Sequence, residues 1–434
     1  MKSIIISSNA SGGGKTTVTL GIMKALSNRG FQVQGYKTGP DYIDSAFHSH
    51  ILGKSSRNLD TFLMSEEGVK ASYSRGTGEL GVIEGVMGLY DGIGIDTEGS
   101  TAHLSKLLDV PVVLVITPKA QSVTLCAEIN GLIDFENVNI AGVILNNISE
   151  GYYKILKLLI ETHCRTKVFG YLPNNKELSI ESRHLGLVQS SEIEDLDKKI
   201  QICAELLENH VDIDMMLEHF KETKKYEDNF HIKRGQLNIA VALDKAFSFY
   251  YKENLEMLEE AGNVTYFSPL KDKSLPDNID FLYLGGGYPE VFIDELSSNK
   301  TMMQSIKNAL DKGLHCYAEC GGLMYLTESI NGKQTVGFFK GKAVMSDELQ
   351  NFGYAEIEVE KDNPLIKKGS KIRCHEFHKS YVELNEETIY KITKKNYDNS
   401  HENWKCGYLK NNTIGTYAHV HFFDIMRLSS ILKY

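Results

Sequence analysis

The chain has 434 residues, of which 42% are hydrophobic and 24% charged, and its formal net charge is −10. This length is too great for one ordinary hydrophobic core, so we expect two or three domains. The acidic balance argues against a nucleic-acid partner, because proteins that bind nucleic acids neutralise phosphates with a basic face. No apolar run approaches the length of a membrane span or a signal peptide, so we expect no membrane partner and a cytoplasmic location.

The cysteine pattern favours the same compartment. The seven cysteines are scattered along the chain, and none of them forms a C-x-x-C pair. A disulfide framework or a structural zinc site would need paired spacings. We therefore expect free thiols in a reducing cytosol.

Short apolar runs alternate with helical segments through the first half of the chain. The strand-like runs lie at residues 2–8, 31–36, 80–85, 110–117 and 140–147. Buried strands of a parallel sheet are continuous apolar runs, and the helices between them cover the sheet. The pattern predicts an α/β domain of strand–helix units that ends with a helical segment over residues 196–220.

A polar stretch separates this half from the next. The sequence KETKKYEDNFHIKRGQ carries few large apolar residues, so we place a domain boundary near residues 222–235. We expect a P-loop synthetase domain at residues 1–225 and a second α/β domain at residues 236–434. In the second domain the strand-like LNIAVAL, DFLYLGGG and LHCYAEC alternate with helical segments, and shorter β-like pieces fill the last hundred residues.

The turn after the first expected strand has the pattern of a phosphate-binding loop. Its residues are Ser11, Gly12, Gly13, Gly14, Lys15, Thr16 and Thr17. Glycines let backbone N–H groups surround phosphate oxygens, a lysine reaches the β/γ-phosphates, and a hydroxyl binds magnesium. Asn9 stands where the usual pattern has its first glycine, and asparagine tolerates a positive φ. The strand before the loop and the helix after it favour an ATP site over a glycine-rich turn without nucleotide.

Polar residues at the ends of later strands accompany this loop. KTGPDYIDSAFH contains Asp41 and Asp44, and VIEGVMGLYDG contains Glu84 and Asp91. Glu84 ends an apolar strand, where P-loop enzymes hold an acid near magnesium. Asp41 and Asp44 taken alone would suit a turn equally well, because G-P-D is strong turn chemistry, but carboxylates at strand ends face the ligand crevice. Asn146 is a candidate for contacting the base of the nucleotide.

The run LHCYAECGGLMYL predicts a strand, a sharp turn and a helix, with Cys320 at the turn. Ala318 and Gly322 flank the cysteine at a distance of two residues, and such small neighbours permit a strained turn that holds a nucleophile exposed. We expect the helix N-terminus to lower the pKa of the thiol. A buried structural cysteine is the alternative, and it is our expectation for Cys316.

Two further motifs would complete a site around this cysteine. GTYAHVHF supplies His419 and His421, which are expected on one face of a strand as candidate bases. LGGGYPE supplies backbone donors at Gly286 and Gly287 for an oxyanion. Because a cysteine, a glycine loop and a late histidine occur together, the sequence favours nucleophilic catalysis over separate structural roles.

The second half resembles a class I glutamine amidotransferase (glutaminase) domain, and the whole chain resembles the cobyrinate a,c-diamide synthase family. The segments that carry the resemblance are SGGGKTTVTLGIMKAL, YKTGPDYIDSAFH, RNLD, IEGVMGLYDG, GVILNN, ESRHLGLV, DKAFSFYY, GGGYPE, YAECGGLMYL, CHEFHKS and TYAHVHF. They span nearly the whole chain. GPDYID, EGVMGLYDG and ESRHLGL are far more specific than the P-loop, a looser pattern that dethiobiotin synthetase shares.

The resemblance implies a reaction. ATP and glutamine would serve to amidate the a and c acetate carboxylates of cobyrinic acid, a corrin ring, through acyl phosphates in cobalamin biosynthesis. Mg²⁺ is the implied cofactor, and our candidate ligands are Thr16, Asp41 and Glu84. The candidate substrate-binding residues are Asp44, Asp91, Arg183 and His184, although a surface ion pair is the alternative for Arg183.

The resemblance also implies roles in the second half. Cys320 would attack the side-chain amide of glutamine, His419 would activate Cys320, and Gly286 and Gly287 would hold the oxyanion. Many glutaminases carry Glu two residues after this histidine. His421 stands there in this chain, which leaves the third member of the triad open.

Alternatives remain for the identity of the ring substrate and for the class of protein. Related amidases act on nickel sirohydrochlorin or on cobalt-free hydrogenobyrinic acid, and no residue indicates which metal the ring holds. The first half also resembles partitioning and cell-division ATPases, which are nucleotide-driven switches. GGGYPE and AECGG argue against a switch, because a switch needs no glutaminase. We expect the assembly to be a homodimer.

Overall fold

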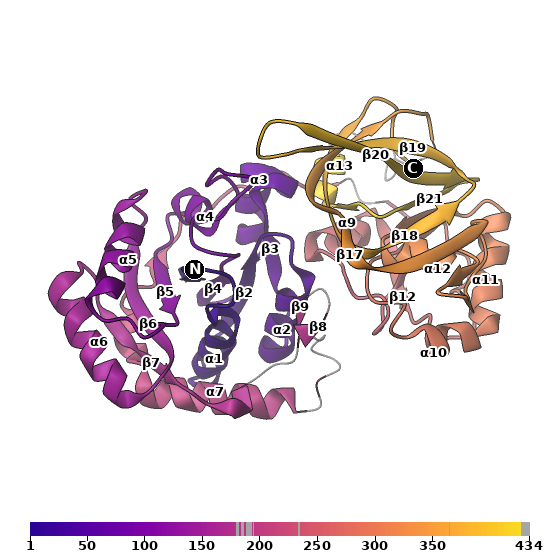
Figure 1. The fold of residues 1–434 in the computed structure, drawn as a ribbon. Helices are drawn as coiled ribbons and strands as arrows, with labels where there is room; N and C mark the ends of the chain where they lie inside the picture. Colours follow the sequence, from indigo (N-terminus) through magenta and orange to yellow (C-terminus); the bar gives the residue numbers. More distant parts are fainter. Residues whose placement is uncertain are drawn as a thin grey trace. The chain divides into compact units, whose positions relative to one another are not determined.

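The computed structural model describes residues 1–178, 182–183, 186–187, 193, 195–232, 235–363 and 365–426. The chain forms two compact units, one from residues 1–61 and 65–229 and the other from residues 62–64 and 230 onward. The main division therefore lies in the charged stretch after the helical segment at residues 196–220. Both units are α/β, with helices beside a central sheet (Figure 1).

A parallel sheet forms the centre of the first unit, in the strand order β3-β2-β4-β1-β5-β6-β7. The strands are β1 (Lys2–Ser8), β2 (Val33–Thr38), β3 (Arg57–Leu59), β4 (Leu80–Glu84), β5 (Val112–Ile116), β6 (Ile140–Ile148) and β7 (Val168–Pro173). All neighbouring pairs on this path are parallel. The short β10 (Lys221–Glu222) pairs with β1 in the antiparallel direction. The ends of β1, β2 and β4, which carry the candidate residues, consequently meet at one edge of the sheet.

Helices cover this sheet (Figure 1). They are α1 (Lys15–Asn28), α2 (Tyr42–Leu52), α3 (Thr61–Ser74), α4 (Thr101–Leu108), α5 (Val123–Asp134), α6 (Glu150–His163), α7 (Leu196–His210) and α8 (Ile213–Leu217). The apolar face of α1 packs on the sheet through Val18 and Ile22. Gly21 allows α7 to approach α1, because a Cβ at Gly21 would lie 2.6 Å from the Cys203 sulfur. The phosphate-loop helix is therefore held between the sheet and α7.

The second unit has a mixed sheet in the order β12-β11-β13-β14-β21-β20-β19-β17-β15-β16, and β18 pairs with β17 and β22. Its strands are β11 (Leu237–Ala242), β12 (Gly262–Phe267), β13 (Phe281–Leu284), β14 (His315–Glu319), β15 (Ser329–Ile330), β16 (Lys333–Gln334), β17 (Gly341–Val359), β18 (Lys371–Leu384), β19 (Glu387–Lys395), β20 (His401–Lys410), β21 (Thr413–Thr416) and β22 (His419–Val420). The path from β12 to β21 is parallel. The central strands β13 and β14 are buried along nearly their whole length.

The helices of this unit are α9 (Lys252–Ala261), α10 (Ile293–Ser298), α11 (Lys300–Asp311), α12 (Gly321–Leu326) and α13 (Phe422–Met426). The sequence predicted short β-like pieces for the last hundred residues, but β17 and β18 are a long antiparallel pair with two register shifts. Bulges change which side chains face the core. That change obscures the two-residue alternation that would have indicated long strands. Among the described residues, no helix is long and apolar enough to cross a membrane.

Candidate active sites

The loop after β1 has the backbone of a phosphate cradle. Gly12 and Gly14 have φ values of 74° and 87°, and Gly14 is the residue before α1. A Cβ on Gly13 would lie 2.1 Å from the Ser8 hydroxyl oxygen, so this position also needs glycine. The loop thus has the glycine backbone that precedes a helix N-terminus, a position that suits an anion.

Asn9 does not hold this loop in the way that we expected. It is not among the residues with positive φ, so tolerance of a left-handed backbone is not the reason why asparagine fits there. Its side-chain nitrogen donates to Glu128 Oε1 at 2.5 Å. Gln121 donates to the other oxygen of Glu128 at 3.0 Å. Asn9 therefore ties the loop to α5.

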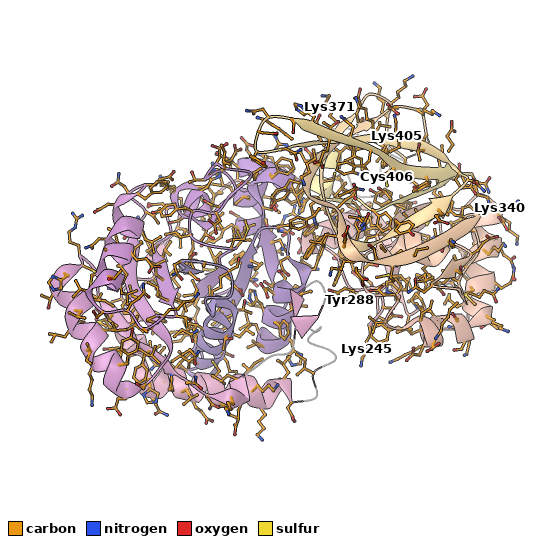
Figure 2. The ribbon with its side chains drawn as sticks, in the orientation of Figure 1. Lys245, Tyr288, Lys340, Lys371, Lys405 and Cys406 are labelled. Carbon is orange, nitrogen blue, oxygen red and sulfur yellow. The ribbon has the colours of Figure 1, made fainter. Side chains whose placement is uncertain are left out.

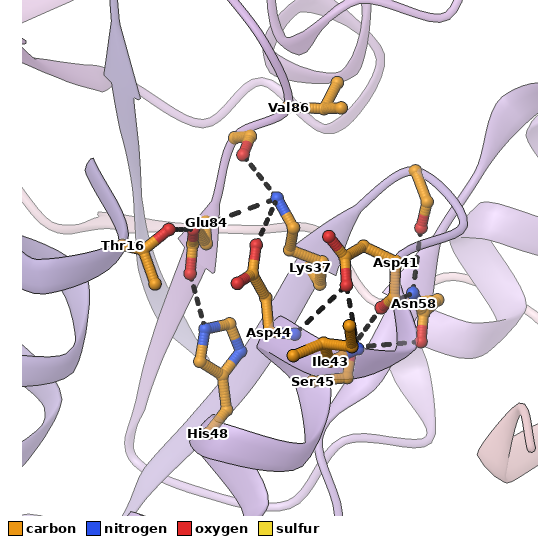
Figure 3. A network of polar contacts seen from close by, with 12 residues as sticks. Thr16, Lys37, Asp41, Ile43, Asp44, Ser45, His48, Asn58, Glu84 and Val86 are labelled. Atoms are coloured by element: carbon orange, nitrogen blue, oxygen red, sulfur yellow. Dashed lines mark hydrogen bonds and ion pairs between the residues drawn. The ribbon is translucent and has the colours of Figure 1, made fainter. Parts of the chain in front are cut away.

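Thr16, in the first turn of α1, contacts Glu84 at the end of β4 (Figure 3). Thr16 Oγ1 donates to Glu84 Oε1 at 2.6 Å, and His48 Nε2 lies 2.7 Å from Glu84 Oε2. Both Glu84 and His48 are fully buried. The first turn of α1, the end of β4 and helix α2 are thereby joined at one carboxylate.

Lys37 is the charged residue of this cluster that the sequence analysis missed. Its side chain is 2% exposed, and its Nζ lies 3.3 Å from Asp44 Oδ2 and 3.9 Å from Glu84 Oε1 (Figure 3). Nζ also donates to the Gly85 carbonyl at 2.6 Å. A lysine inside the otherwise uncharged, buried strand VQGYKT was the signal that could have identified it.

The charges of this cluster depend on one another. Burial would raise the pKa of Glu84, but Lys37 and the hydrogen bonds from His48 and Thr16 lower it to about 2. Burial would lower the pKa of Lys37, yet Glu84 and the two nearby aspartates raise it. Burial, with the charges of Asp41 and Glu84, raises the pKa of Asp44 well above its usual range. Glu84 and Lys37 are therefore ionised, and Asp44 is the carboxylate that takes up a proton most readily.

The phosphate-loop lysine has an environment of its own. Burial, and then the charge of Lys37, lowers the pKa of Lys15, while Glu84, Asp44 and Asp41 act in the opposite direction. A phosphate group near Lys15 would add negative charge and favour the protonated amine. The loop thus has a cation whose charge an anionic ligand would stabilise.

The other predicted residues of the first half have local contacts. Asp41 is the N-cap of α2, and its Oδ1 accepts from the Ile43 and Asp44 amides at 2.8 and 3.1 Å. Asp91 accepts from the Gly88 amide at 2.9 Å. The turn alternative therefore describes part of what Asp41 does. One oxygen of each carboxylate serves the backbone, which limits it as a ligand-binding group.

Asn146 lies against the phosphate loop. Its Nδ2 donates to Thr117 Oγ1 at 2.9 Å, and a Cβ on Gly14 would lie 2.1 Å from the same nitrogen. In this position Asn146 packs beneath the loop from the end of β6. For Arg183 the structure describes the backbone only, in β8 (Ser182–Arg183), which pairs with β9 (Gly186–Leu187). His184 lies outside the described residues.

The second half places Cys320 at a strained turn between β14 and α12. Its φ and ψ are 48° and −103°, which is unfavourable for a residue with a side chain. A Cβ on the following Gly321 would lie 3.2 Å from the Gly287 nitrogen, and one on Gly322 would lie 2.3 Å from the Leu284 carbonyl oxygen. The two glycines let the turn pack closely against the end of β13, the geometry of a nucleophile elbow.

The thiol itself differs from our expectation. Burial, followed by the charges of Glu290 and Glu376, raises the pKa of Cys320, although a backbone hydrogen bond from Gly321 acts in the other direction. The expected lowering by the helix N-terminus is wrong, because α12 has only six residues and the thiol is buried. The resting group is a neutral thiol. A base must therefore remove its proton before attack.

The glycine loop after β13 and His419 lie together. A Cβ on Gly286 would lie 2.6 Å from His419 Cε1 and 3.4 Å from Nε2. The Gly286 carbonyl accepts from the Ser248 amide at 3.1 Å, and the Gly285 amide donates to Tyr250. Tyr288, labelled in Figure 2, packs edge-on against Phe249, with 5.1 Å between the ring centroids. The loop is thereby fixed with the imidazole edge of His419 against Gly286.

His419 in β22 and His421, which follows that strand, face different carboxylates, so the prediction that both lie on one face of a strand is wrong. His419 Nδ1 lies 3.5 Å from Glu319 Oε2, whereas His421 Nε2 lies 3.7 Å from Glu253 Oε2. All four side chains are buried. Glu319 was not predicted from the sequence, although its position directly before the nucleophile was a signal that could have indicated it.

Two family models match the chain. A CobQ/CobB/MinD/ParA nucleotide binding domain matches residues 4–188, and a CobB/CobQ-like glutamine amidotransferase domain matches residues 238–425. The chain is therefore a two-domain α/β protein with a nucleotide-binding half and a glutamine amidotransferase half.

Full-length relatives define the family further. The cobyrinate a,c-diamide synthase of Clostridium tetani (strain Massachusetts / E88) is 64% identical over 438 residues, which cover 100% of both chains. The one from Clostridium acetobutylicum is 64% identical over 426 residues, which cover 98% of both chains. The one from Streptococcus sanguinis (strain SK36) is 43% identical and covers 100% of this chain and 99% of its own. The chain belongs to the cobyrinate a,c-diamide synthase family.

Proposed function

We propose that the protein amidates the a and c acetate carboxylates of cobyrinic acid with ATP and glutamine, in cobalamin biosynthesis. The observation that carries the proposal is the identity of 64% over the full length of relatives that bear this name. The geometry of both halves supports it, because a phosphate loop and a strained cysteine turn occur in one chain. This combination fits an enzyme that activates a carboxylate and also releases ammonia. The seven cysteines are free and buried, which agrees with the proposed cytoplasmic location. A homodimer stays a prediction.

In the first half, a ring carboxylate attacks the γ-phosphorus of ATP, and ADP leaves. The acyl phosphate has a good leaving group, so ammonia can displace phosphate and form the amide. Lys15 and the amides of the loop at residues 11–17 bind the phosphates. Asp44, Asp91, Arg183 and His184 remain our candidates for binding the ring and its carboxylates. One round of this reaction is needed for each of the two amides.

Magnesium fits one part of this cluster. Thr16 Oγ1 and Glu84 are oxygen donors 2.6 Å apart, and the low pKa keeps Glu84 ionised. Mg²⁺ takes oxygen ligands, commonly one or two carboxylates together with phosphate oxygens and water. No group of three or more His, Cys, Asp or Glu side chains suited to a metal occurs among the described residues. Thr16 and Glu84 would hold the ion together with ATP, with Asp41 nearby, and the ion would neutralise charge on the transferring phosphate.

Lys37 joins the proposed set. Its Nζ is held between Asp44 and Glu84, at the end of the strand next to β4. A fixed, buried cation in this place would stabilise the negative charge that develops during phosphoryl transfer. The pKa of Lys37 is raised, so the amine keeps its proton.

In the second half, His419 accepts the thiol proton of Cys320, and the sulfur attacks the side-chain amide carbon of glutamine. The oxyanion lies at the amides of Gly286 and Gly287. His419 then gives the proton to the leaving nitrogen, which departs as ammonia and leaves a thioester. Water, deprotonated by His419, releases glutamate and restores the thiol.

Mass spectrometry of the ring product tests the proposal. The purified protein is mixed with ATP, Mg²⁺ and glutamine labelled with heavy nitrogen at its side-chain amide. Separate reactions contain cobyrinic acid, nickel sirohydrochlorin or hydrogenobyrinic acid. We expect two labelled amides on cobyrinic acid. Amidation of another ring alone would replace the substrate and keep the chemistry, whereas ATP hydrolysis without amidation of any ring would favour the switch of the partitioning type.

A further inference from the structure

A carboxylate lies beside Nδ1 of the His419 imidazole. Nδ1 of the ring is 3.5 Å from Glu319 Oε2, and the Cε1–Nε2 edge faces Gly286. Glu319 and His419 are 1% and 3% exposed, so little water screens their interaction. Catalytic hydrogen bonds are often long in the absence of substrate and shorten in the complex. The separation suits a partner of the imidazole.

We propose that Glu319, the residue directly before the nucleophile, orients His419 and stabilises its protonated form during glutamine hydrolysis. It is a positioning residue that acts through the histidine. The inference rests on the proposed function, because it concerns the glutaminase half of that reaction. It assigns the third member of the site to β14 rather than to the segment after the histidine.

The structure gives His421 a different partner. His421 Nε2 lies 3.7 Å from Glu253 Oε2, and its Nδ1 accepts from the Phe423 amide at 3.3 Å. These contacts tie the residue between β22 and α13 to α9 and to the first turn of α13. They do not bring His421 to His419. Its place in the sequence, two residues after the catalytic histidine, therefore does not make it the partner of that ring.

Glu319 is itself held in place by several contacts. It ends β14, where it pairs with Thr416 of β21. Tyr283 donates from its hydroxyl to Glu319 Oε2 at 3.0 Å, and the Val420 amide lies 3.4 Å from Oε1. Donors from β13 and β22 thus fix both oxygens. A carboxylate restrained in this way can orient a ring without losing rotamer entropy in each catalytic cycle.

Another neighbour of His419 carries no charge. His375 of β18 stacks on the His419 ring, with 5.1 Å between the ring centroids and 20° between the ring planes. Burial, and then the charge of His419, lowers the pKa of His375 well below its usual range. The Tyr251 hydroxyl lies 2.9 Å from His375 Nε2. Beside His419, Glu319 is thus a negatively charged neighbour and His375 a neutral one, and the charges of Glu290 and Glu376 also act on Cys320.

Glu319 matters because the resting thiol is neutral. When the proton passes from Cys320 to His419, the ring becomes an imidazolium that would be costly in a buried site. The Glu319 carboxylate beside Nδ1 compensates this charge and keeps the other nitrogen directed at the thiol. No oxidant or further reactant takes part, since the proton returns to the leaving nitrogen.

Glu319→Gln tests the inference, with Glu253→Gln as the matched control. Glu253 is an equally buried carboxylate that faces the other histidine. We expect Glu319→Gln to lower kcat for glutamine hydrolysis by about 100-fold. KM for glutamine and the amidation supported by free ammonia should stay close to their wild-type values. Glu253→Gln should keep wild-type kcat.

A pH profile separates positioning from a structural role. Loss of the Glu319 charge should move the acidic limb of kcat/KM down by about one pH unit, because the protonated ring is less stabilised. Glu319→Asp keeps the charge and should restore the position of the limb with a reduced rate. The inference would be overturned if Glu319→Gln kept the wild-type kcat and the wild-type position of the acidic limb. It would also be overturned if Glu319→Gln and Glu253→Gln lost kcat equally.

Alkylation of Cys320 by iodoacetamide, located by peptide mass spectrometry, provides a readout without turnover. Glu319→Gln should slow it by about tenfold, since the thiol depends on His419 for deprotonation. An alkylation rate that is unchanged in Glu319→Gln contradicts the inference. Absence of glutamine hydrolysis in the wild type would instead reject the proposed function, and the alkylation result would still decide the role of Glu319. If Glu319→Gln does not fold, the alkylation rate of Cys320 in Glu319→Asp is measured instead. A wild-type rate in that variant would exclude Glu319 as the residue that positions His419.

Discussion

Thr16 Oγ1 donates a hydrogen bond of 2.6 Å to Glu84 Oε1, which joins the first turn of α1 to the end of β4. His48 occupies the second oxygen of the same carboxylate at 2.7 Å. Glu84 is fully buried and stays ionised because cationic and hydrogen-bonding neighbours surround it. The stability of the first unit should therefore depend on the protonation of this one group.

Acid should remove that contribution. The pKa of Glu84 is about 2 in the folded chain, against 4.5 for an ordinary glutamate side chain. A lowered pKa stabilises the fold above pH 4.5, and the contribution is lost as the pH falls toward 2. The difference of 2.5 units corresponds to about 3 kcal/mol. Urea unfolding gives the free energy of unfolding of the wild type and of Glu84→Gln. The difference between the two should shrink by about this amount from pH 4.5 to pH 2. A constant gap would mean that Glu84 does not titrate in this range.

Lys37→Met should destabilise the fold strongly. Removing the buried cation leaves Asp44 and Glu84 without their common partner, which costs about 3–5 kcal/mol. Lys37→Met with Asp44→Asn should lose less than Lys37→Met alone, because one uncompensated carboxylate is gone. Urea unfolding of the double-mutant cycle measures this coupling. Lys371→Met, in an exposed pair with Glu356, should leave the midpoint nearly unchanged. Additive losses would contradict the coupling.

The sequence predicted the strand–helix rhythm of both halves and the two turns that carry the sites, because glycine spacing and apolar runs are local signals. The partners of those turns were harder to predict. Lys37 stands within a strand, and its role depends on β2 lying beside β4. Glu319 was not predicted, since its partner His419 is about a hundred residues away in sequence and lies beside it only in the folded chain. The direction of the Cys320 pKa was mispredicted because burial cannot be determined from the residues around a turn.

The strain at Cys320 predicts an unusual order of stabilities. With φ at 48° and ψ at −103°, any side chain at this position is unfavourable, and glycine relieves the strain. Cys320→Gly should be more stable than Cys320→Ala by about 1 kcal/mol, despite the greater flexibility of glycine in the unfolded chain. Thermal or urea unfolding measures the difference. Both variants should lose glutamine-dependent amidation and keep the reaction with ammonia, so a more stable alanine variant would argue against strain.

Gly286→Ala should separate ammonia production from amide formation. The new Cβ would lie 2.6 Å from His419 Cε1, so the imidazole must move away from the oxyanion loop. We expect glutamine hydrolysis to fall by about 100-fold, since both the base and the oxyanion donors are displaced. Amidation with free ammonia should continue at nearly the wild-type rate. Gly151→Ala, where a Cβ meets nothing within 4 Å, is the matched substitution and should change neither reaction. Equal loss of both activities in Gly286→Ala would place the damage in the fold rather than in the glutaminase site.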